Sequence, residues 1–258
     1  MMEKYDYQIE HEFNAVDAFL KDKYGVNIKQ KEQLIEFIQA CLFFLLSFKV
    51  WKVHLSEHFS KTPKIEMYFQ EMISNIIHIM VLGALDMKIP ALVMLRRTQE
   101  IILTYLFYSE HPVEMYKKEV DDSIRNIAGF TELKEYIKNY PFSMKYHVID
   151  KDIQALVSDI INDWSMQYKE LSNFVHGTNT LYFQGIENLN SFQFDKKDIN
   201  FLSKQVKRLA SIGNSLFIIF YFQEYVNFDE STEKSLIRRS IANEYNYKNR
   251  IVEILKEI

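Results

Sequence analysis

The chain has 258 residues, 48% of them hydrophobic and 15% aromatic, which excludes a disordered protein and is ample for a large buried core. Only six glycines and four prolines are present, too few for the many tight turns of an all-β protein. The formal charge of −4 gives no overall attraction to phosphate backbones, so a nucleic-acid site would have to be a local basic patch.

The cysteine content indicates a reducing compartment, and the apolar segments indicate neither a signal peptide nor a membrane span. The single Cys41 cannot form an internal disulfide. The first 22 residues are rich in charge and lack the continuous apolar stretch of a signal peptide. The most membrane-like segment, 40–48, is far shorter than the roughly 20 apolar residues that a span needs, so we interpret it as part of a buried core helix. We therefore expect a cytoplasmic protein without membrane association.

In the first half of the chain, apolar residues at helical spacing predict helices over 2–23, 29–60, 64–87 and 91–108. Gly25 follows the first of them, as glycine often does at a helix end, and Pro63 follows the second. Pro90 is expected as the first residue of the fourth helix, where its missing N–H costs nothing. This fourth helix is apolar nearly all round, which is typical of a central helix.

The fourth helix nevertheless carries a pair of opposite charges. Arg96 and Glu100 lie one turn apart, on the same face as the apolar Leu103 and Phe107. A charged pair in such a place must be mutually satisfied, because burying an unpaired charge costs several kcal/mol. Two interpretations stay open: an internal salt bridge that fixes the register of the helix, or an arginine that lines a functional site. Arg97, about 100° further round, is expected at the surface.

The second half predicts shorter helices over 112–126 and 131–140, a loop opening at Pro141, and a long amphipathic helix from about 150 to Gly177. Segments 180–184 and 191–195 then form either a short β-hairpin or an ordered loop, before long helices over 198–225 and 231–258. The prediction is an all-α, multi-helix bundle of about eight or nine helices, folded as a single helical domain over 1–258, with the one candidate hairpin near 180–195.

The end of the long helix before Gly177 carries a polar stripe beside its apolar face. With Trp164 at the middle of the apolar face, the side chains of Ser165, Lys169, Ser172 and His176 fall at roughly 80–140° from it. His176 therefore faces a groove or a partner rather than the middle of the core.

These two helices together carry short motifs of a known kind. The first is Leu95-Arg96-x-x-x-Glu100, and the second is Tyr168-x-x-Leu171-Ser172-x-x-Val175-His176-Gly177. The pair resembles the HEPN-like superfamily (higher eukaryotes and prokaryotes nucleotide-binding helical domains), and is most similar to uncharacterised prokaryotic groups with Leu-Arg-x-x-x-Glu and Leu-Ser-x-x-Val-His-Gly helices. The resemblance covers about 64–215 and leaves helical N- and C-terminal extensions outside it.

The resemblance implies a helical bundle that often dimerises. Many members are metal-independent ribonucleases of toxin–antitoxin, CRISPR and phage-defence systems, with an arginine followed after four to six residues by a histidine on one helix. The histidine moves protons between the 2′-hydroxyl and the leaving oxygen, and the cation stabilises the charged phosphorane.

The sequence departs from the family motif at the arginine. Position 171 is a leucine, and the longest allowed spacing before His176 places Lys169 where the family has arginine. The resemblance thus implies His176 as general acid and base, with Lys169 or Arg96 as the phosphate-stabilising cation. Binding or structural support is expected from Glu100, Ser172, Arg97 and Tyr168.

Two functions are therefore expected as alternatives. The first is an RNA-directed protein of prokaryotic stress or phage defence, acting as a metal-independent endoribonuclease. The second is a non-catalytic helical binding or scaffold module, or an antitoxin-like regulator. The expected partners are RNA, a second copy of the chain and a protein from the same operon. Tyr182 and Phe183 either form part of a dimer interface or fold back over the end of the bundle.

Other polar clusters carry less information. His54 and His58 are four residues apart on a helix, a spacing that suits metal ligation, but no third ligand is evident and a surface pair is expected. We predict neither a metal nor a cofactor. Five basic residues near the C-terminus form either basic patches or solvated helix faces: Lys204, Lys207, Arg208, Arg238 and Arg239.

Overall fold

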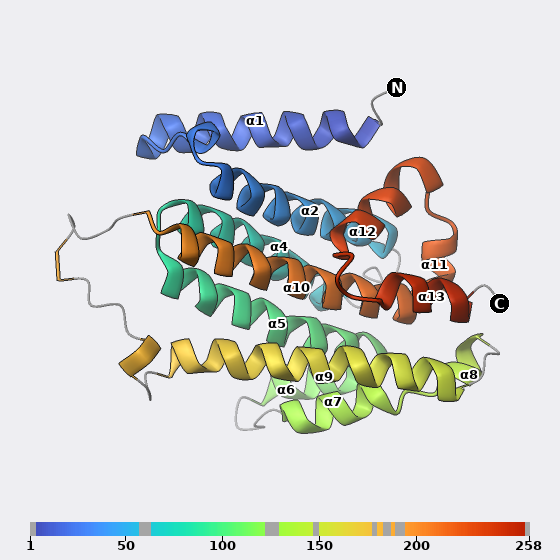
Figure 1. Cartoon of the computed structure of the whole chain (residues 1–258). Helices are drawn as coiled ribbons and strands as arrows, with labels where there is room; N and C mark the ends of the chain where they lie inside the picture. The colour runs from blue at the N-terminus through green and yellow to red at the C-terminus, as the bar shows by residue number, and fades with distance from the viewer. Residues whose placement is uncertain are drawn as a thin grey trace.

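The computed structural model describes residues 4–56, 63–121, 129–146, 150–176, 180–182, 187–188 and 194–255. These residues form twelve α-helices, joined in places by 3₁₀ or π-helical turns, and contain no β-strand (Figure 1). The predicted all-α bundle is confirmed. The count of eight or nine helices is wrong, because two predicted long helices, 198–225 and 231–258, are each broken into two and α8 forms where a loop was predicted.

Long helices make up most of both halves of the chain. The first half contains α1 (Lys4–Tyr24), α2 (Glu32–His54), α4 (Pro63–Ala84), α5 (Lys88–Glu110) and α6 (Pro112–Val120), with a 3₁₀ turn at Ile28–Gln30. The second half contains α7 (Phe130–Lys138), α8 (Phe142–Tyr146), α9 (Asp150–Val175), α10 (Lys196–Phe220), α11 (Phe222–Val226), α12 (Ser235–Ser240) and α13 (Tyr247–Leu255). A 3₁₀ turn lies at Thr180–Tyr182 and a π-helical turn at Glu230–Lys234.

Several helix ends are set by local backbone conformation or by a capping side chain. Gly25 follows α1 with φ of +68°, the left-handed conformation that glycine adopts without a Cβ clash. The Glu132 carboxylate accepts a hydrogen bond of 2.6 Å from the backbone N–H of Gly129 before α7. The side chain of Asp195 accepts one of 2.7 Å from the N–H of Lys197 and caps α10.

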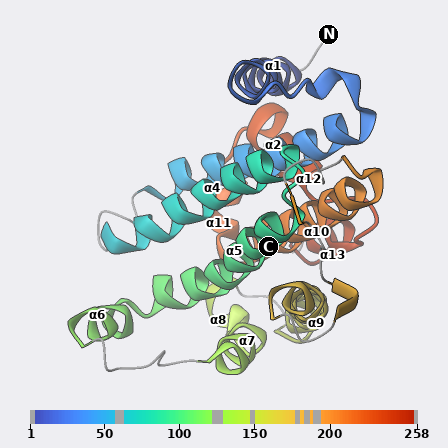
Figure 2. The ribbon, with the colours of Figure 1, turned by 90° about the vertical axis from the view of Figure 1, so that its left-hand side faces the viewer.

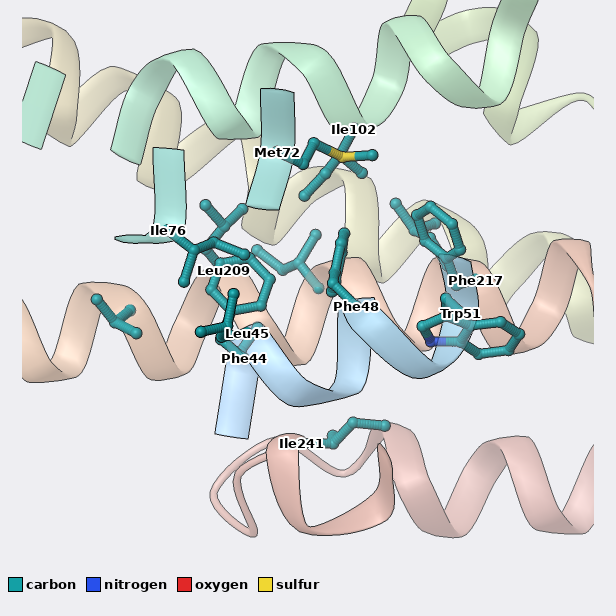
Figure 3. Packing of buried hydrophobic residues seen from close by; sticks show 14 of the residues in the cluster. Phe44, Leu45, Phe48, Trp51, Met72, Ile76, Ile102, Leu209, Phe217 and Ile241 are labelled. Carbon is teal, nitrogen blue, oxygen red and sulfur yellow. The ribbon is translucent and has the colours of Figure 1, made fainter. Parts of the chain in front are cut away.

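The centre of the bundle is built by α2, α4, α5 and α10 (Figures 1 and 2). Phe48 and Trp51 of α2 pack against Phe217 of α10, with ring centroids 5.2 and 5.6 Å apart, as Figure 3 shows. Tyr105 of α5 stacks on the same Phe217 ring at 5.4 Å. These four rings are fully buried, so their apolar surface is removed from water, which is the main stabilising term of such a core.

Two buried hydrogen bonds through one asparagine fix α2 against α10 inside this aromatic core. The indole Nε1 of Trp51 donates to Asn214 Oδ1 at 3.0 Å, and Asn214 Nδ2 donates to Ser47 Oγ at 3.0 Å. Asn214 and Ser47 have no exposed surface. Because each of these buried groups has a hydrogen-bond partner, the two hydrogen bonds specify the register of the helices at little cost in desolvation.

The predicted core helix around 40–48 is confirmed. It belongs to α2, in which residues including Phe44, Leu46 and Phe48 are buried by the surrounding helices. Among the described residues, α2 is the one helix with the length and apolar composition that could cross a membrane, and 67% of that apolar window is buried inside the bundle. Its hydrophobicity is therefore accounted for by its central position.

Two proline-based expectations are wrong. Helix α5 begins at Lys88, so Pro90 is its third residue rather than its first. The missing N–H is tolerated there, because the first four N–H groups of a helix have no partner within the helix. After Pro141 the chain forms the short helix α8 instead of a loop. Tyr146 of this helix donates to the carbonyl oxygen of Phe220 at 2.6 Å, which holds α8 on the C-terminal end of α10.

The predicted final helix over 231–258 is also wrong, since residues 241–246 separate α12 from α13. Ile241 leaves the helical conformation with ψ of 111°, and the N–H of Ala242 donates to Ser211 Oγ on α10 at 2.9 Å. The break lets Tyr247 reach α9, where its hydroxyl donates to the Asp163 carboxylate at 2.9 Å. A tertiary contact has replaced the local helix.

No hairpin strand forms in the described part of 180–195. Thr180–Tyr182 is a 3₁₀ turn, and the Tyr182 ring packs edge-on against Phe174 of α9 at 4.7 Å. Asn173 Nδ2 also donates to the Tyr182 hydroxyl at 3.4 Å. Phe183 and most of the predicted hairpin lie outside the described residues, as does Gly177, the predicted stop of the long helix.

Candidate functional site

The candidate site lies where α5 packs against α9, near the C-terminal end of α9 (Figures 1 and 2). Arg96 of α5 is its centre. One terminal nitrogen, Nη1, lies 2.8 Å from Nε2 of His176, and the other, Nη2, donates to the Tyr168 hydroxyl at 2.7 Å. The Nε of Arg96 donates to Glu100 Oε1 at 3.2 Å. The structure thus brings together residues 80 positions apart in the sequence.

Tyr168 and Glu100 complete the arrangement around the guanidinium. The Tyr168 hydroxyl donates to Glu100 Oε1 at 3.0 Å, and its ring lies under the Arg96 guanidinium, 4.7 Å from it. Burial raises the pKa of the Tyr168 phenol, against the opposing effect of the hydrogen bond from Arg96. Tyr168 is therefore neutral at physiological pH and serves as both donor and acceptor.

The two interpretations of the Arg96–Glu100 pair are not exclusive in this geometry. The pair forms a salt bridge along one helix, as the first interpretation requires, with side chains 14% and 29% exposed. The same arginine also reaches His176 on the neighbouring helix, as the second requires. Because the guanidinium carries its donors in a fixed plane, it can bind a carboxylate with one edge and other groups with the rest.

The contact with arginine defines the hydrogen-bonding role of Nε2 of His176. Arginine carries only donors and stays protonated in proteins, so Nε2 of His176 must accept this hydrogen bond. His176 is exposed at the end of α9, so its ring is accessible to water or a ligand. Nε2 can accept a proton once a ligand takes the Arg96 donor that it binds here.

The sequence around His176 explains how the ring is placed. Helix α9 ends at Val175, and the backbone N–H of His176 still donates to the carbonyl oxygen of Ser172 at 3.0 Å. The Ser172 hydroxyl in turn donates to the carbonyl oxygen of Tyr168 at 2.6 Å. Ser172 thus has a backbone partner one turn away, which is a supporting contact within the helix rather than a contact with Arg96.

A buried double hydrogen bond sets the register of α5 against α9 behind the site. Gln99 Nε2 donates to the carbonyl oxygen of Trp164 at 2.8 Å, and Trp164 Nε1 donates to the carbonyl oxygen of Gln99 at 3.1 Å. Trp164 also stacks on Tyr168 with ring centroids 4.9 Å apart. Gln99 was not among the predicted site residues; a glutamine on a mostly apolar helix, next to Glu100, was the signal that could have identified it.

The predicted polar stripe is present, but Lys169 does not join the Arg96 cluster. Ser165 and Ser172 are half-buried and Lys169 and His176 are exposed, whereas Trp164 is buried. Lys169 points to solvent on the surface of α9, and it forms no hydrogen bond or ion pair with any described residue. It can contribute charge to the surface around the site, while Arg96 is the cation in contact with His176.

Arg97 and the histidine pair lie away from this cluster. Arg97 is at the surface as predicted and forms an ion pair of 2.8 Å with Glu71 of α4. His54 Nε2 lies 2.8 Å from Glu233 and its ring stacks on Phe228 at 3.9 Å, while His58 is outside the described residues. Among the residues that the structure describes, no group of three or more histidine, cysteine and acidic side chains is arranged to hold a metal ion.

Compared with known proteins, the chain matches no family model, no curated protein and no solved structure. The resemblance to HEPN-like proteins therefore stays a prediction from the two motifs. The geometry around Arg96 and His176 is the remaining basis for a function.

Proposed function

We propose that this protein acts on RNA as a metal-independent endoribonuclease, with His176 as general acid and base and Arg96 as the phosphate-stabilising cation. The observation that carries the proposal is the contact of 2.8 Å between the Arg96 guanidinium and the exposed imidazole of His176. These are the two residue types that the reaction requires, and they come from different helices. The resemblance to HEPN-like proteins of stress and phage-defence systems supports the same reaction.

The proposed chemistry needs one proton acceptor and one fixed positive charge. A phosphodiester oxygen takes the Arg96 donor that now meets His176, which frees Nε2 of the histidine. His176 then accepts the proton of the 2′-hydroxyl while that oxygen attacks the phosphorus, and the protonated ring returns a proton to the leaving 5′-oxygen. Arg96 stabilises the negative charge that gathers on the phosphorane oxygens. The products are a 2′,3′-cyclic phosphate and a 5′-hydroxyl end.

Glu100 and Tyr168 have positioning roles in this proposal. Both hold the guanidinium from the side opposite to His176, so Arg96 keeps its place when a phosphate arrives. Lys169 lies on the solvent side of the same helix as His176 and provides further positive charge for the RNA backbone. RNA binding through these cations is expected to weaken as salt concentration rises, because salt screens their attraction to the phosphates. A homodimer would place two such sites in one assembly.

The direct test is RNA cleavage in the presence of EDTA, with two variants and a matched control. His176→Ala and Arg96→Met are expected to abolish cleavage, because each removes one of the two reacting side chains. Arg97→Met removes the adjacent arginine, which pairs with Glu71 at the surface, and is expected to leave cleavage unchanged. Absence of cleavage by the wild-type protein, or equal cleavage by all four proteins, contradicts the proposal.

A second function is favoured by one observation, namely that Glu100 already neutralises Arg96. In a non-catalytic binding or scaffold module, or an antitoxin-like regulator, the cluster would act as a clamp between α5 and α9. Under this alternative, Arg96→Met and His176→Ala lower Tm by several degrees, and no RNA cleavage is seen with any variant. Measuring Tm and cleavage on the same preparations separates the two functions.

A further inference from the structure

A second site is formed at the break between α12 and α13. There the chain segment that interrupts the predicted final helix covers a cavity of about 550 Å³ against α2 and α10. Its lining includes neither Arg96 nor His176, so it is separate from the candidate site. The volume is in the range of pockets that hold small ligands.

The walls of this cavity are fixed before any ligand binds. Ser211 of α10 is fully buried and its hydroxyl accepts a hydrogen bond from the backbone N–H of Ala242 at 2.9 Å, which holds the segment onto α10. At the far end of the segment, Tyr247 is anchored to Asp163 of α9 by a hydrogen bond of 2.9 Å. The backbone of the covering segment therefore needs little further ordering on binding, so less of the binding free energy is lost there.

Three cations line the cavity: Lys207 of α10, Arg239 of α12 and Lys248 of α13. The guanidinium of Arg239 lies over the ring of Phe43 at 4.9 Å from its centroid, and a guanidinium is the side chain that binds phosphate oxygens in pairs. Lys248 Nζ donates to Asn243 Oδ1 at 3.0 Å, and burial lowers the pKa of this lysine. Neither Lys207 nor Lys248 forms an ion pair with any described residue.

The cavity also contains groups that would bind the uncharged part of a ligand. Glu36 of α2 and Glu244 of the covering segment supply carboxylate oxygens, which accept hydrogen bonds from hydroxyl or amino groups. Gln39 and Asn243 add amides that act as donors and acceptors. A site for a bare anion would not place two carboxylates beside its cations, because they repel the same charge. The mixture suits a molecule with one anionic end and one hydroxylated end.

We propose that this cavity binds a small phosphate ester that carries hydroxyl groups, such as a sugar phosphate or a nucleotide. Lys207, Arg239 and Lys248 contact the phosphate, and Glu36 and Glu244 accept hydrogen bonds from the hydroxyl groups. The limited size and the mixed charge favour a small molecule over a long polyanion, which needs an extended basic surface. The proposal is independent of RNA cleavage, because binding here involves none of the residues around Arg96.

The test is binding of glucose 6-phosphate, AMP and inorganic phosphate to the full chain, measured by calorimetry and by the ligand-induced rise in Tm. We compare the wild-type protein with Lys207→Met and Lys248→Met. The matched control is Lys204→Met, which removes an exposed lysine one turn from Lys207 on α10 that does not line the cavity. Helical content and Tm without ligand show that each variant is folded.

We expect at least one of the two esters to bind more tightly than inorganic phosphate, and each cavity variant to weaken that binding by about tenfold while the control does not. The proposal is overturned if neither ester stabilises the wild-type protein at about 5 mM, a concentration that would saturate even a weak specific site. It is equally overturned if inorganic phosphate binds as tightly as the esters, or if Lys207→Met and Lys248→Met bind like Lys204→Met.

Discussion

Replacing Arg208 by methionine should destabilise the protein chiefly by leaving the buried carboxylate of Asp163 without its counter-charge. Arg208 also forms an ion pair of 3.6 Å with Glu170, but that side chain is 41% exposed. Arg208 of α10 binds Asp163 of α9 with Nε at 3.1 Å and with Nη2, which also donates to the Asp163 backbone carbonyl at 3.2 Å. Both side chains are only 12% exposed. In Arg208→Met the carboxylate of Asp163 keeps one side-chain donor, the Tyr247 hydroxyl at 2.9 Å, and loses its counter-charge.

The size of the effect follows from this burial. Removing one partner of a fully buried ion pair costs about 3–5 kcal/mol, because the other charge is left without compensation. The remaining exposure of Asp163 and its bond to Tyr247 reduce that figure, so we expect about 2–4 kcal/mol. For a chain of this length, that corresponds to a fall in Tm of roughly 4–16 °C.

A second arginine that pairs with an aspartate of α9 supplies the control. Arg250 of α13 binds Asp159 of α9 at 2.6 Å, but these side chains are 30% and 56% exposed. Arg250→Met should therefore cost less than about 1 kcal/mol, as surface pairs usually do. Thermal unfolding followed by circular dichroism compares the two variants. The double variant Arg208→Met with Asp163→Asn should recover part of the lost stability, since both charges are then absent. Equal Tm values for Arg208→Met and Arg250→Met would refute the reasoning.

Three further predictions concern packing, pH and the candidate site. Gly83→Ala should lower the free energy of unfolding by about 1–3 kcal/mol in urea, because the added Cβ overlaps the fully buried ring of Phe37. The control is Gly129, an open position, which should tolerate alanine at a cost of about 0.5 kcal/mol or less. Burial raises the pKa of several tyrosines above the ordinary value of 10, and the most buried of them are Tyr105, Tyr146 and Tyr221. Because the unfolded chain loses these protons first, the free energy of unfolding should fall above pH 10 by about 1.4 kcal/mol per pH unit for each tyrosine. Gradual tyrosine ionisation without loss of helical signal would contradict this. Tyr168→Phe keeps the ring and removes the hydroxyl between Arg96 and Glu100, so Tm should fall by the equivalent of about 1 kcal/mol; an unchanged Tm would mean that the hydroxyl does not hold Arg96.

Much of the helical fold could be predicted because it depends on local patterns. The spacing of apolar residues identified α9, and the position of Trp164 on it correctly separated the buried face from the stripe that ends at His176. Gly25 marked the end of α1 for a reason confined to its own backbone conformation. Signals of this kind need no knowledge of the rest of the chain.

The failures occur where a distant residue decides the local structure. The helical pattern of 231–258 is interrupted because the Ser211 hydroxyl takes the N–H of Ala242, and Ser211 lies 31 residues earlier. The 3₁₀ turn at Thr180–Tyr182 replaces the start of the predicted hairpin where Tyr182 packs on Phe174. Local propensity is a weak preference, and tertiary contacts of this kind override it.

The contact between Arg96 and His176 belongs to the same class of long-range effects. Sequence spacing placed each residue on its own helix but not one helix against the other, so Lys169 and Arg96 were equally suitable as the cation. What selects Arg96 is the register of α5 against α9, which the paired hydrogen bonds between Gln99 and Trp164 set at the backbone. Trp164 lies one turn before Tyr168, and Gln99 precedes Glu100, so the same register places the tyrosine hydroxyl on both charged partners. The polar groups buried behind the site thus determine which cation His176 meets. In a variant that lacks Arg96, Lys169 should therefore not take over as the cation of the site, because Lys169 points to solvent and nothing brings it to the imidazole of His176.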